Sequence, residues 1–178
     1  TVAPTGTVAK LAGVSEGIHP IYSRYFVRRV RYAEGDAALA ELVAQGYETE
    51  PCIYNPHTTV VLFHVRDAIL DVGNADLVEQ ADELTVAEKL SVQEAVQRLY
   101  ADNAVSYTVN MSESTTPEEL FTGLAEYLPR LKGTTVFPFN SRAQSPYTEI
   151  TEAEYAAAVD HGVAQAFDEC ATGACPIR

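Results

Sequence analysis

Three Ser/Thr-x-x-Glu sites, interpreted as capping boxes, predict where helices begin in this sequence. They are Thr85 with Glu88, Thr116 with Glu119, and Thr151 with Glu154. In such a capping box, the hydroxyl and the carboxylate bond backbone N–H groups that a helix start leaves without partners. The patterns predict helices that run to about Tyr100, Leu131 and Phe167. Pro117 at the first helical position supports the second of them.

Strand-like runs lie between these helices, at residues 58–65, 105–111 and 134–139. In the second run, apolar residues at every other position alternate with Ser106, Thr108 and Asn110, so one face is apolar and the other polar. Helices that alternate with strands indicate an α/β architecture with at least some parallel pairing. Residues 51–56 and 139–147 are predicted loops, and residues 168–178 a mobile tail.

Composition narrows the class of protein. Hydrophobic residues make up 47% of the chain and charged residues 21%, which is typical of a globular domain. The net charge of −13 disfavours a nucleic-acid-binding module. An arginine cluster at residues 24–31, interleaved with aromatic residues, is better interpreted as a helix or strand end with solvated charges, or as arginines buried against carboxylates in a larger parent protein. No apolar run approaches the roughly 20 residues of a membrane span, and no secretion signal is visible.

The first motif with chemical potential comprises Ala3, Pro4, Thr5, Gly6 and Thr7. A strand, a tight Pro/Gly turn and a helix start leave backbone N–H groups available to an anion. Thr5 and Thr7 add hydroxyl donors, and Gly6 allows a phosphate to approach the backbone closely. The motif lacks the Walker pattern. An ordinary turn remains the alternative at this point.

The second motif is the pair Cys170 and Cys175 near the chain end; the third cysteine, Cys52, stands alone. An odd number of cysteines without a secretion signal indicates a reducing compartment, where a close pair is more often catalytic or metal-binding than structural. Small residues between the two thiols allow a disulfide to close. The four histidines are scattered, which argues against zinc. We predict a redox role for the pair, with inert thiols as the alternative.

Together, these segments resemble the large subunit of ribonucleotide reductase. Residues 1–32, 102–111 and 131–142 resemble three family segments in the same order, and the ending C-A-T-G-A-C-P-I-R resembles the redox tail of adenosylcobalamin-dependent members. Val136, Phe137 and Pro138 stand where the di-iron class carries a tyrosine pair, and neither a four-cysteine cluster nor a glycyl-radical motif is visible. These departures favour the cobalamin class. His19 occupies a position where the family often has an acidic residue, so it is assigned no role.

The resemblance implies that residues 1–167 form the C-terminal part of a ten-stranded α/β barrel and that residues 168–178 form a mobile cysteine tail. Ala3, Pro4, Thr5, Gly6 and Thr7 would hold the phosphates of a ribonucleotide substrate. Cys170 and Cys175 would re-reduce the active site and be reduced by thioredoxin or a similar dithiol donor. Adenosylcobalamin would be bound mostly by the upstream N-terminal part. The enzyme would be cytoplasmic, with no nucleic-acid or membrane partner.

The start at Thr1 is expected of a fragment, produced by an intein junction, a split gene or a truncated record. Alone, such a fragment would be inactive. Cys52 lies in a loop-like stretch, residues 51–54, and is not recruited to the site. Two alternatives from other classes remain: a free-standing thiol–disulfide protein and a non-catalytic α/β binding domain. The sequence leaves open whether the substrate is a diphosphate or a triphosphate.

Overall fold

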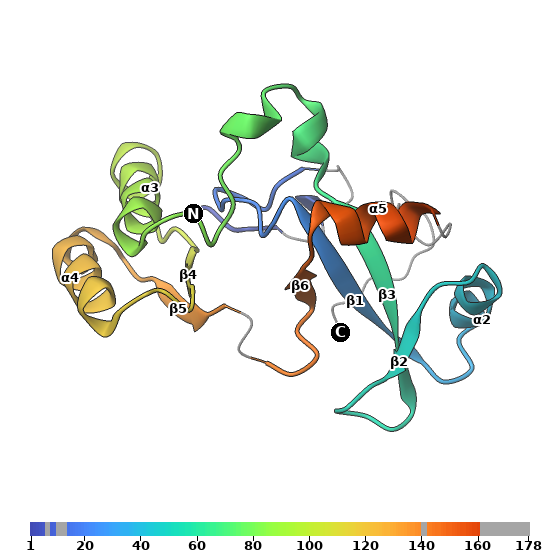
Figure 1. The fold of residues 1–178 in the computed structure, drawn as a ribbon. Helices are drawn as coiled ribbons and strands as arrows, with labels where there is room; N and C mark the ends of the chain where they lie inside the picture. Colours follow the sequence, from blue (N-terminus) through green and yellow to red (C-terminus); the bar gives the residue numbers. More distant parts are fainter. Residues whose placement is uncertain (6–7, 10–13, 140–141, 161–178) are drawn as a thin grey trace. The chain divides into compact units, whose positions relative to one another are not determined.

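The computed structural model describes residues 1–5, 8–9, 14–139 and 142–160 (Figure 1). The chain divides into two compact units, residues 1–22 with 68–139 and residues 23–67 with 140–178. Within the described ranges, no helix has the length and hydropathy needed to cross a membrane.

The second unit is built on an antiparallel sheet with the strand order β2-β3-β1-β6. At its centre, β1 (Tyr25–Ala33) pairs with β3 (Thr58–Arg66) along their whole length. The short strands β2 (Thr49–Pro51) and β6 (Tyr147–Glu149) extend the sheet on either side. This sheet was not predicted as a unit, although the run at residues 58–65 is confirmed as β3.

Two helices accompany this sheet, α2 (Ala37–Ala44) and α5 (Glu152–Asp160), and each contacts both central strands. Asp36 caps α2 by accepting a hydrogen bond from the Ala38 N–H. The core of the unit consists of buried apolar side chains from β1, β3, α2 and the turn after α2: Val30, Tyr32, Leu42, Tyr47, Val61 and Phe63. Burying each large side chain contributes about 1.5–3 kcal/mol.

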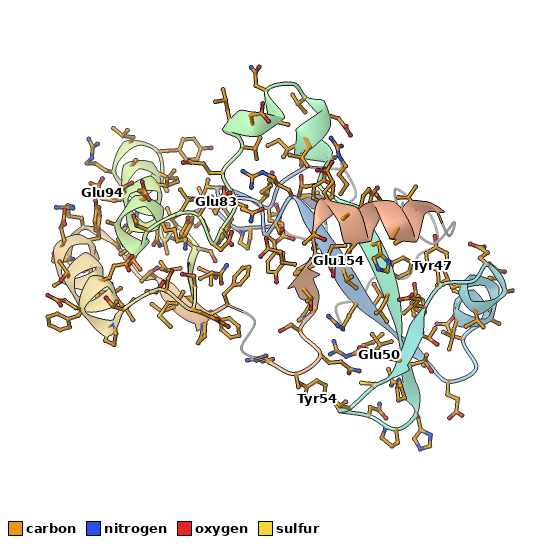
Figure 2. All side chains as sticks on the ribbon, viewed as in Figure 1. Tyr47, Glu50, Tyr54, Glu83, Glu94 and Glu154 are labelled. Carbon is orange, nitrogen blue, oxygen red and sulfur yellow. The ribbon has the colours of Figure 1, made fainter. Side chains whose placement is uncertain are left out.

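Three arginines of the cluster lie on β1 and Arg24 precedes it; Arg28 and Arg29 are half-buried, and Arg31 is exposed. The Arg29 Nε lies 3.0 Å from the Glu50 carboxylate, and a terminal nitrogen of Arg29 donates to the Thr148 hydroxyl. The Arg31 guanidinium lies 5.5 Å from the centre of the Tyr54 ring. Figure 2 labels Glu50 and Tyr54 on β2 and the turn that follows it. The prediction of a carboxylate partner is confirmed for Arg29, and the partner belongs to this chain.

The first unit holds α3 (Val86–Leu99) and a β-α-β arrangement in which α4 (Pro117–Tyr127) connects two parallel strands. These strands are β4 (Thr108–Met111) and β5 (Thr135–Pro138), with Thr108 opposite Thr135. The unit also contains three short 3-10 helices: η1 (Ala68–Asp71), η2 (Ala75–Leu77) and η3 (Leu128–Arg130). The parallel pair confirms the predicted α/β character.

The core of the first unit follows the predicted apolar alternation. Tyr107 and Val109 are buried against Val86 and Leu90 of α3. The predicted apolar face of α4 packs against them through Leu120, Leu124, Tyr127 and Leu131. Leu128, which was predicted on the same face, is 44% exposed. The α-helix ends one residue earlier, at Tyr127, and the chain continues as η3, because Pro129 has no N–H to donate to the carbonyl four residues before it.

The predicted element boundaries hold with local shifts. The threonine hydroxyl accepts from the third helical N–H at all three predicted starts. The reciprocal bond from the glutamate completes the capping box at Thr85 and Thr151, whereas the Glu119 carboxylate accepts from the Val86 N–H instead. The strand predicted at residues 105–111 is regular only from Thr108, while Val105 forms an isolated parallel bridge with Val2. Pro51 and Tyr147, predicted in loops, belong to β2 and β6. The described part of the third helix ends at Asp160, and residues 161–178, with the predicted tail, lie outside the described residues.

Substituting Gly123 tests the packing of α4 on α3. A Cβ at this position would lie 2.9 Å from Val86 Cγ1 and 3.5 Å from Leu90 Cδ1. We expect Gly123→Val to lower the free energy of unfolding by about 2 kcal/mol through overpacking. The control is Ala125→Val on the exposed face of α4, which should cost less than about 0.7 kcal/mol. Urea denaturation measures both, and equal losses would contradict the packing.

Candidate functional site

The segment before the predicted anion-binding turn pairs with the chain at one residue, Val2, through an isolated parallel bridge to Val105. The Val2 carbonyl accepts from the Ser106 N–H at 2.9 Å, and the Val2 N–H donates to the Ala104 carbonyl at 3.3 Å. After the turn, the Thr5 carbonyl accepts from the Ala9 N–H at 2.9 Å, which is a helical hydrogen bond. The predicted strand before the turn is thus reduced to a single bridge, and one helical hydrogen bond follows the turn. Gly6 and Thr7 lie outside the described residues.

Thr5 lies in the left-handed region of backbone space, with a φ of 48°. This conformation is costly for a β-branched residue and is often found at functional sites. Ala3 and Thr5 are exposed and Pro4 is half-buried, so the turn is open to a ligand. The geometry is compatible with a phosphate site, and that role remains a prediction for all five residues.

Gly17 supports the same turn from the other side. Its φ is 59°, and a Cβ there would lie 2.9 Å from the Pro4 Cα and 3.2 Å from the Ala3 carbonyl oxygen. Both neighbours are backbone atoms, which cannot move as a side chain does. Only glycine combines the left-handed conformation with this close approach.

His19 connects the Gly17 segment to β4. Its Nε2 lies 3.0 Å from the Thr108 backbone nitrogen, and its Nδ1 lies 3.1 Å from the Glu16 carbonyl oxygen. The imidazole stacks on the Tyr107 ring, with 4.5 Å between ring centres and 6° between planes. Burial lowers the pKa of His19, with smaller opposing effects from the Glu16 carbonyl and carboxylate. Sequence reasoning assigned this residue no role; its departure from the family's acidic residue was the available signal.

Two buried polar side chains of α3 donate hydrogen bonds to backbone carbonyls in and just before β4 and β5. The Lys89 ammonium donates to the Asn110 carbonyl at 2.8 Å. The Gln93 amide donates to the carbonyls of Val105 at 3.0 Å and Gly133 at 2.7 Å. Burial lowers the pKa of Lys89, while the charges of Asp82, Glu119 and Glu88 oppose this change. Sequence reasoning missed both residues, since polar residues in an amphipathic helix are normally placed on its exposed face.

The predicted redox pair, Cys170 and Cys175, lies outside the described residues, and its role remains a prediction. Cys52 is a buried free thiol in the second unit. The Tyr54 backbone N–H is the main cause that lowers the pKa of the Cys52 thiol, and Arg31 contributes. In the described ranges, no group of three or more His, Cys, Asp or Glu side chains is placed to hold a metal ion.

Comparison with known proteins defines the class to which this chain belongs. Residues 1–135 match the family model described as the barrel domain of ribonucleotide reductase. The chain therefore belongs to the ribonucleotide reductase family, which confirms the predicted resemblance.

Individual relatives show which members of the family the chain is similar to. The chain is 42% identical to a putative adenosylcobalamin-dependent ribonucleoside-triphosphate reductase of Mycobacterium phage D29, covering 100% of this chain and 28% of the relative. It is 36% identical to the adenosylcobalamin-dependent ribonucleoside-triphosphate reductase of Lactobacillus gasseri, covering 26% of that protein. A crystal structure of a B12-dependent, class II ribonucleotide reductase matches with a TM-score of 0.75 and 32% identity, over 100% of this chain and 25% of that one. The chain thus spans about a quarter of the length of these proteins.

Gly17→Ala tests whether the Gly17 segment supports the turn. We expect it to lower the free energy of unfolding by about 3 kcal/mol, because backbone overlap with Pro4 adds to a left-handed cost of about 1–2 kcal/mol. Gly73→Ala is the matched control, since Gly73 has a φ of 91° and a Cβ there would meet nothing within 4 Å. Chemical denaturation of both variants gives the comparison. Equal losses would show that Pro4 does not pack on Gly17.

Proposed function

We propose that this chain is the C-terminal part of an adenosylcobalamin-dependent ribonucleotide reductase, and that it provides the substrate-phosphate loop and the dithiol that re-reduces the active site. The observation that carries the proposal is the turn at residues 3–5, which lies between a parallel β-bridge at Val2 and a helical hydrogen bond in a chain of this family. Relatives that match the whole chain are named ribonucleoside-triphosphate reductases, which favours a triphosphate substrate.

In this proposal, Ala3, Pro4, Thr5, Gly6 and Thr7 hold the substrate phosphates. Backbone N–H groups and the two threonine hydroxyls would donate to phosphate oxygens. The chain has a net charge of −13, so a phosphate needs such local donors to offset repulsion from the surrounding carboxylates. This arrangement would fix the ribose for replacement of its 2′-hydroxyl by hydrogen.

Cys170 and Cys175 would act as the electron relay. In each turnover the two thiols would reduce the active-site disulfide and form a disulfide themselves, giving up two electrons and two protons. Thioredoxin or a similar dithiol would then restore them. A tail at residues 168–178 would carry the pair between the active site and the external donor.

The remaining part of the reductase would complete the enzyme. Val2 forms a parallel bridge with Val105, and β4 pairs in parallel with β5. Parallel pairing with a helix between strands is the pattern of an α/β barrel, and we propose that these segments belong to its ten strands. When bound, adenosylcobalamin would supply the radical chemistry that starts the reaction. We place the cofactor site mainly in the upstream part, as the family resemblance implies. We also propose a cytoplasmic location.

The two alternatives, a free-standing redox protein and a binding domain, fit less well, because the relatives that match the whole chain are about four times as long as it is.

Complementation tests this function. Adenosylcobalamin-dependent formation of deoxynucleotide is measured with thioredoxin, for this chain alone and together with the upstream part of the reductase. We expect activity only in the combined sample. No activity with any upstream partner, from well-folded material, would contradict the proposal.

The tail has a separate test in the combined sample. We expect the double variant Cys170→Ser, Cys175→Ser to lose thioredoxin-supported activity to background and to regain part of it with a small dithiol, which reaches the active site directly. Cys52→Ser is the matched control and should retain thioredoxin-supported turnover. Full activity of the double variant with thioredoxin would exclude the relay.

A further inference from the structure

We propose that His19 is a positioning residue for the substrate-phosphate loop: it anchors the Glu16–Gly17 turn to β4, and this turn holds Ala3 and Pro4 in place. This inference rests on the proposed phosphate site at residues 3–7. It assigns a role to a residue that the sequence reasoning left without one.

The partners of the ring determine where its proton lies. The Thr108 backbone N–H can only donate, so the Nε2 that it faces at 3.0 Å must accept. The Glu16 carbonyl can only accept, so the Nδ1 at 3.1 Å must donate. The imidazole is therefore neutral and carries its proton on Nδ1. Stacking on Tyr107 at 4.5 Å fixes its orientation.

The imidazole is connected to the loop through the backbone of Glu16 and Gly17. The Glu16 carbonyl that accepts from the ring precedes Gly17, where the backbone comes so close to Pro4 that an added Cβ would lie 2.9 Å from its Cα. A shift of the turn by even a few tenths of an ångström would therefore move or release Pro4.

Both ends of the loop segment are attached to the stretch of backbone at residues 104–108. Before the loop, Val2 forms a parallel bridge with Val105. After it, His19 accepts from Thr108, three positions further along. The loop is thus held between two anchors on one short stretch of backbone. Loss of the His19 anchor would leave the Val2 side fixed, while the segment after the loop would be held only further along, at Ile21, whose carbonyl accepts from the Ala81 N–H at 2.9 Å.

Protonation would remove this anchor. A charged imidazole carries N–H on both nitrogens, so Nε2–H would face the Thr108 N–H as a second donor. In the described part of the chain, the titratable groups facing the ring are the Glu16 carboxylate, which favours the cation, and the Tyr107 phenol, which burial keeps neutral by raising its pKa to about 12. Burial of His19 outweighs Glu16 and lowers its pKa. The anchor is therefore complete above the ordinary histidine pKa of 6.5 and is lost as the pH falls through the lowered value.

The test uses the reductase assembled from this chain and its upstream part. We measure kcat, the KM for a ribonucleoside triphosphate, and inhibition by inorganic tripolyphosphate, which tests the phosphate site alone. His19→Ala should raise both the KM and the tripolyphosphate inhibition constant about tenfold, as loss of a hydrogen bond to a fixed loop predicts, and change kcat less. His19→Gln, whose amide oxygen can accept from Thr108, should recover most of this loss. In the wild-type assembly, kcat/KM should fall at low pH as His19 becomes protonated. This fall should be absent in His19→Gln. His57→Gln, at an exposed histidine of the second unit, is the control.

A second loop variant separates the two proposals. Gly6→Val should block the approach of phosphate and abolish tripolyphosphate inhibition. If Gly6→Val has this effect while His19→Ala leaves both constants unchanged, the His19 inference is wrong and the phosphate loop stands. If neither variant changes tripolyphosphate inhibition, the phosphate loop itself is wrong.

A spectroscopic readout covers the case in which His19→Ala fails to fold. In the wild-type assembly labelled with ¹⁵N-histidine, we expect at pH 7.5 a neutral His19 ring with its proton on Nδ1. A charged ring, or a proton on Nε2, would overturn the inference whatever the variants do.

Discussion

Hydrogen bonds to the backbone of residues 104–111 hold the candidate site together. Val2 pairs with this stretch before the proposed phosphate loop, and His19 bonds it after the loop. β5 pairs along its other edge. From α3, Lys89 and Gln93 donate to its carbonyl groups. The position of the loop therefore depends on one strand, whose apolar side chains Tyr107 and Val109 fix it in the core.

The polar groups behind this strand are expensive to bury. Lys89 and Gln93 are almost fully buried, and each loses its hydration on folding. Hydrogen bonds to strand carbonyls offset much of that cost, although the Gln93 Oε1 has no partner among the described residues. Apolar residues would fill the same space but could bond no strand carbonyl. We interpret the two side chains as fixing where α3 lies along the strand, and so the geometry at the loop.

Local sequence predicted the elements whose signals are local. A capping box needs only residues three apart, and all three helix starts were found. The alternation at residues 105–111 was found because one face is buried and the other is not. β1 was missed because its arginines interrupt an apolar pattern, and the partners that accommodate them, such as Glu50 and Thr148, lie far away in sequence. α2 was missed because its eight residues carry only a single capping aspartate.

The candidate site, like the helices and strands, was predicted only where its signals are local. The motif at residues 3–7 could be recognised because proline and glycine restrict the backbone locally. The supports of that motif could not: His19 acts through Thr108, 89 residues away, and Gly17 through a contact with the Pro4 backbone. Neither contact leaves a pattern that spacing alone can reveal. Family resemblance gave the chemistry, and only the structure indicates what keeps the loop in place.

A structure of the assembled reductase with a ribonucleoside triphosphate bound tests the central claim most directly. We predict phosphate oxygens within about 3 Å of backbone N–H groups at residues 5–7, with the Glu16–Gly17 turn still packed on Pro4. A triphosphate bound elsewhere, with the loop making no contact to it, would contradict the account.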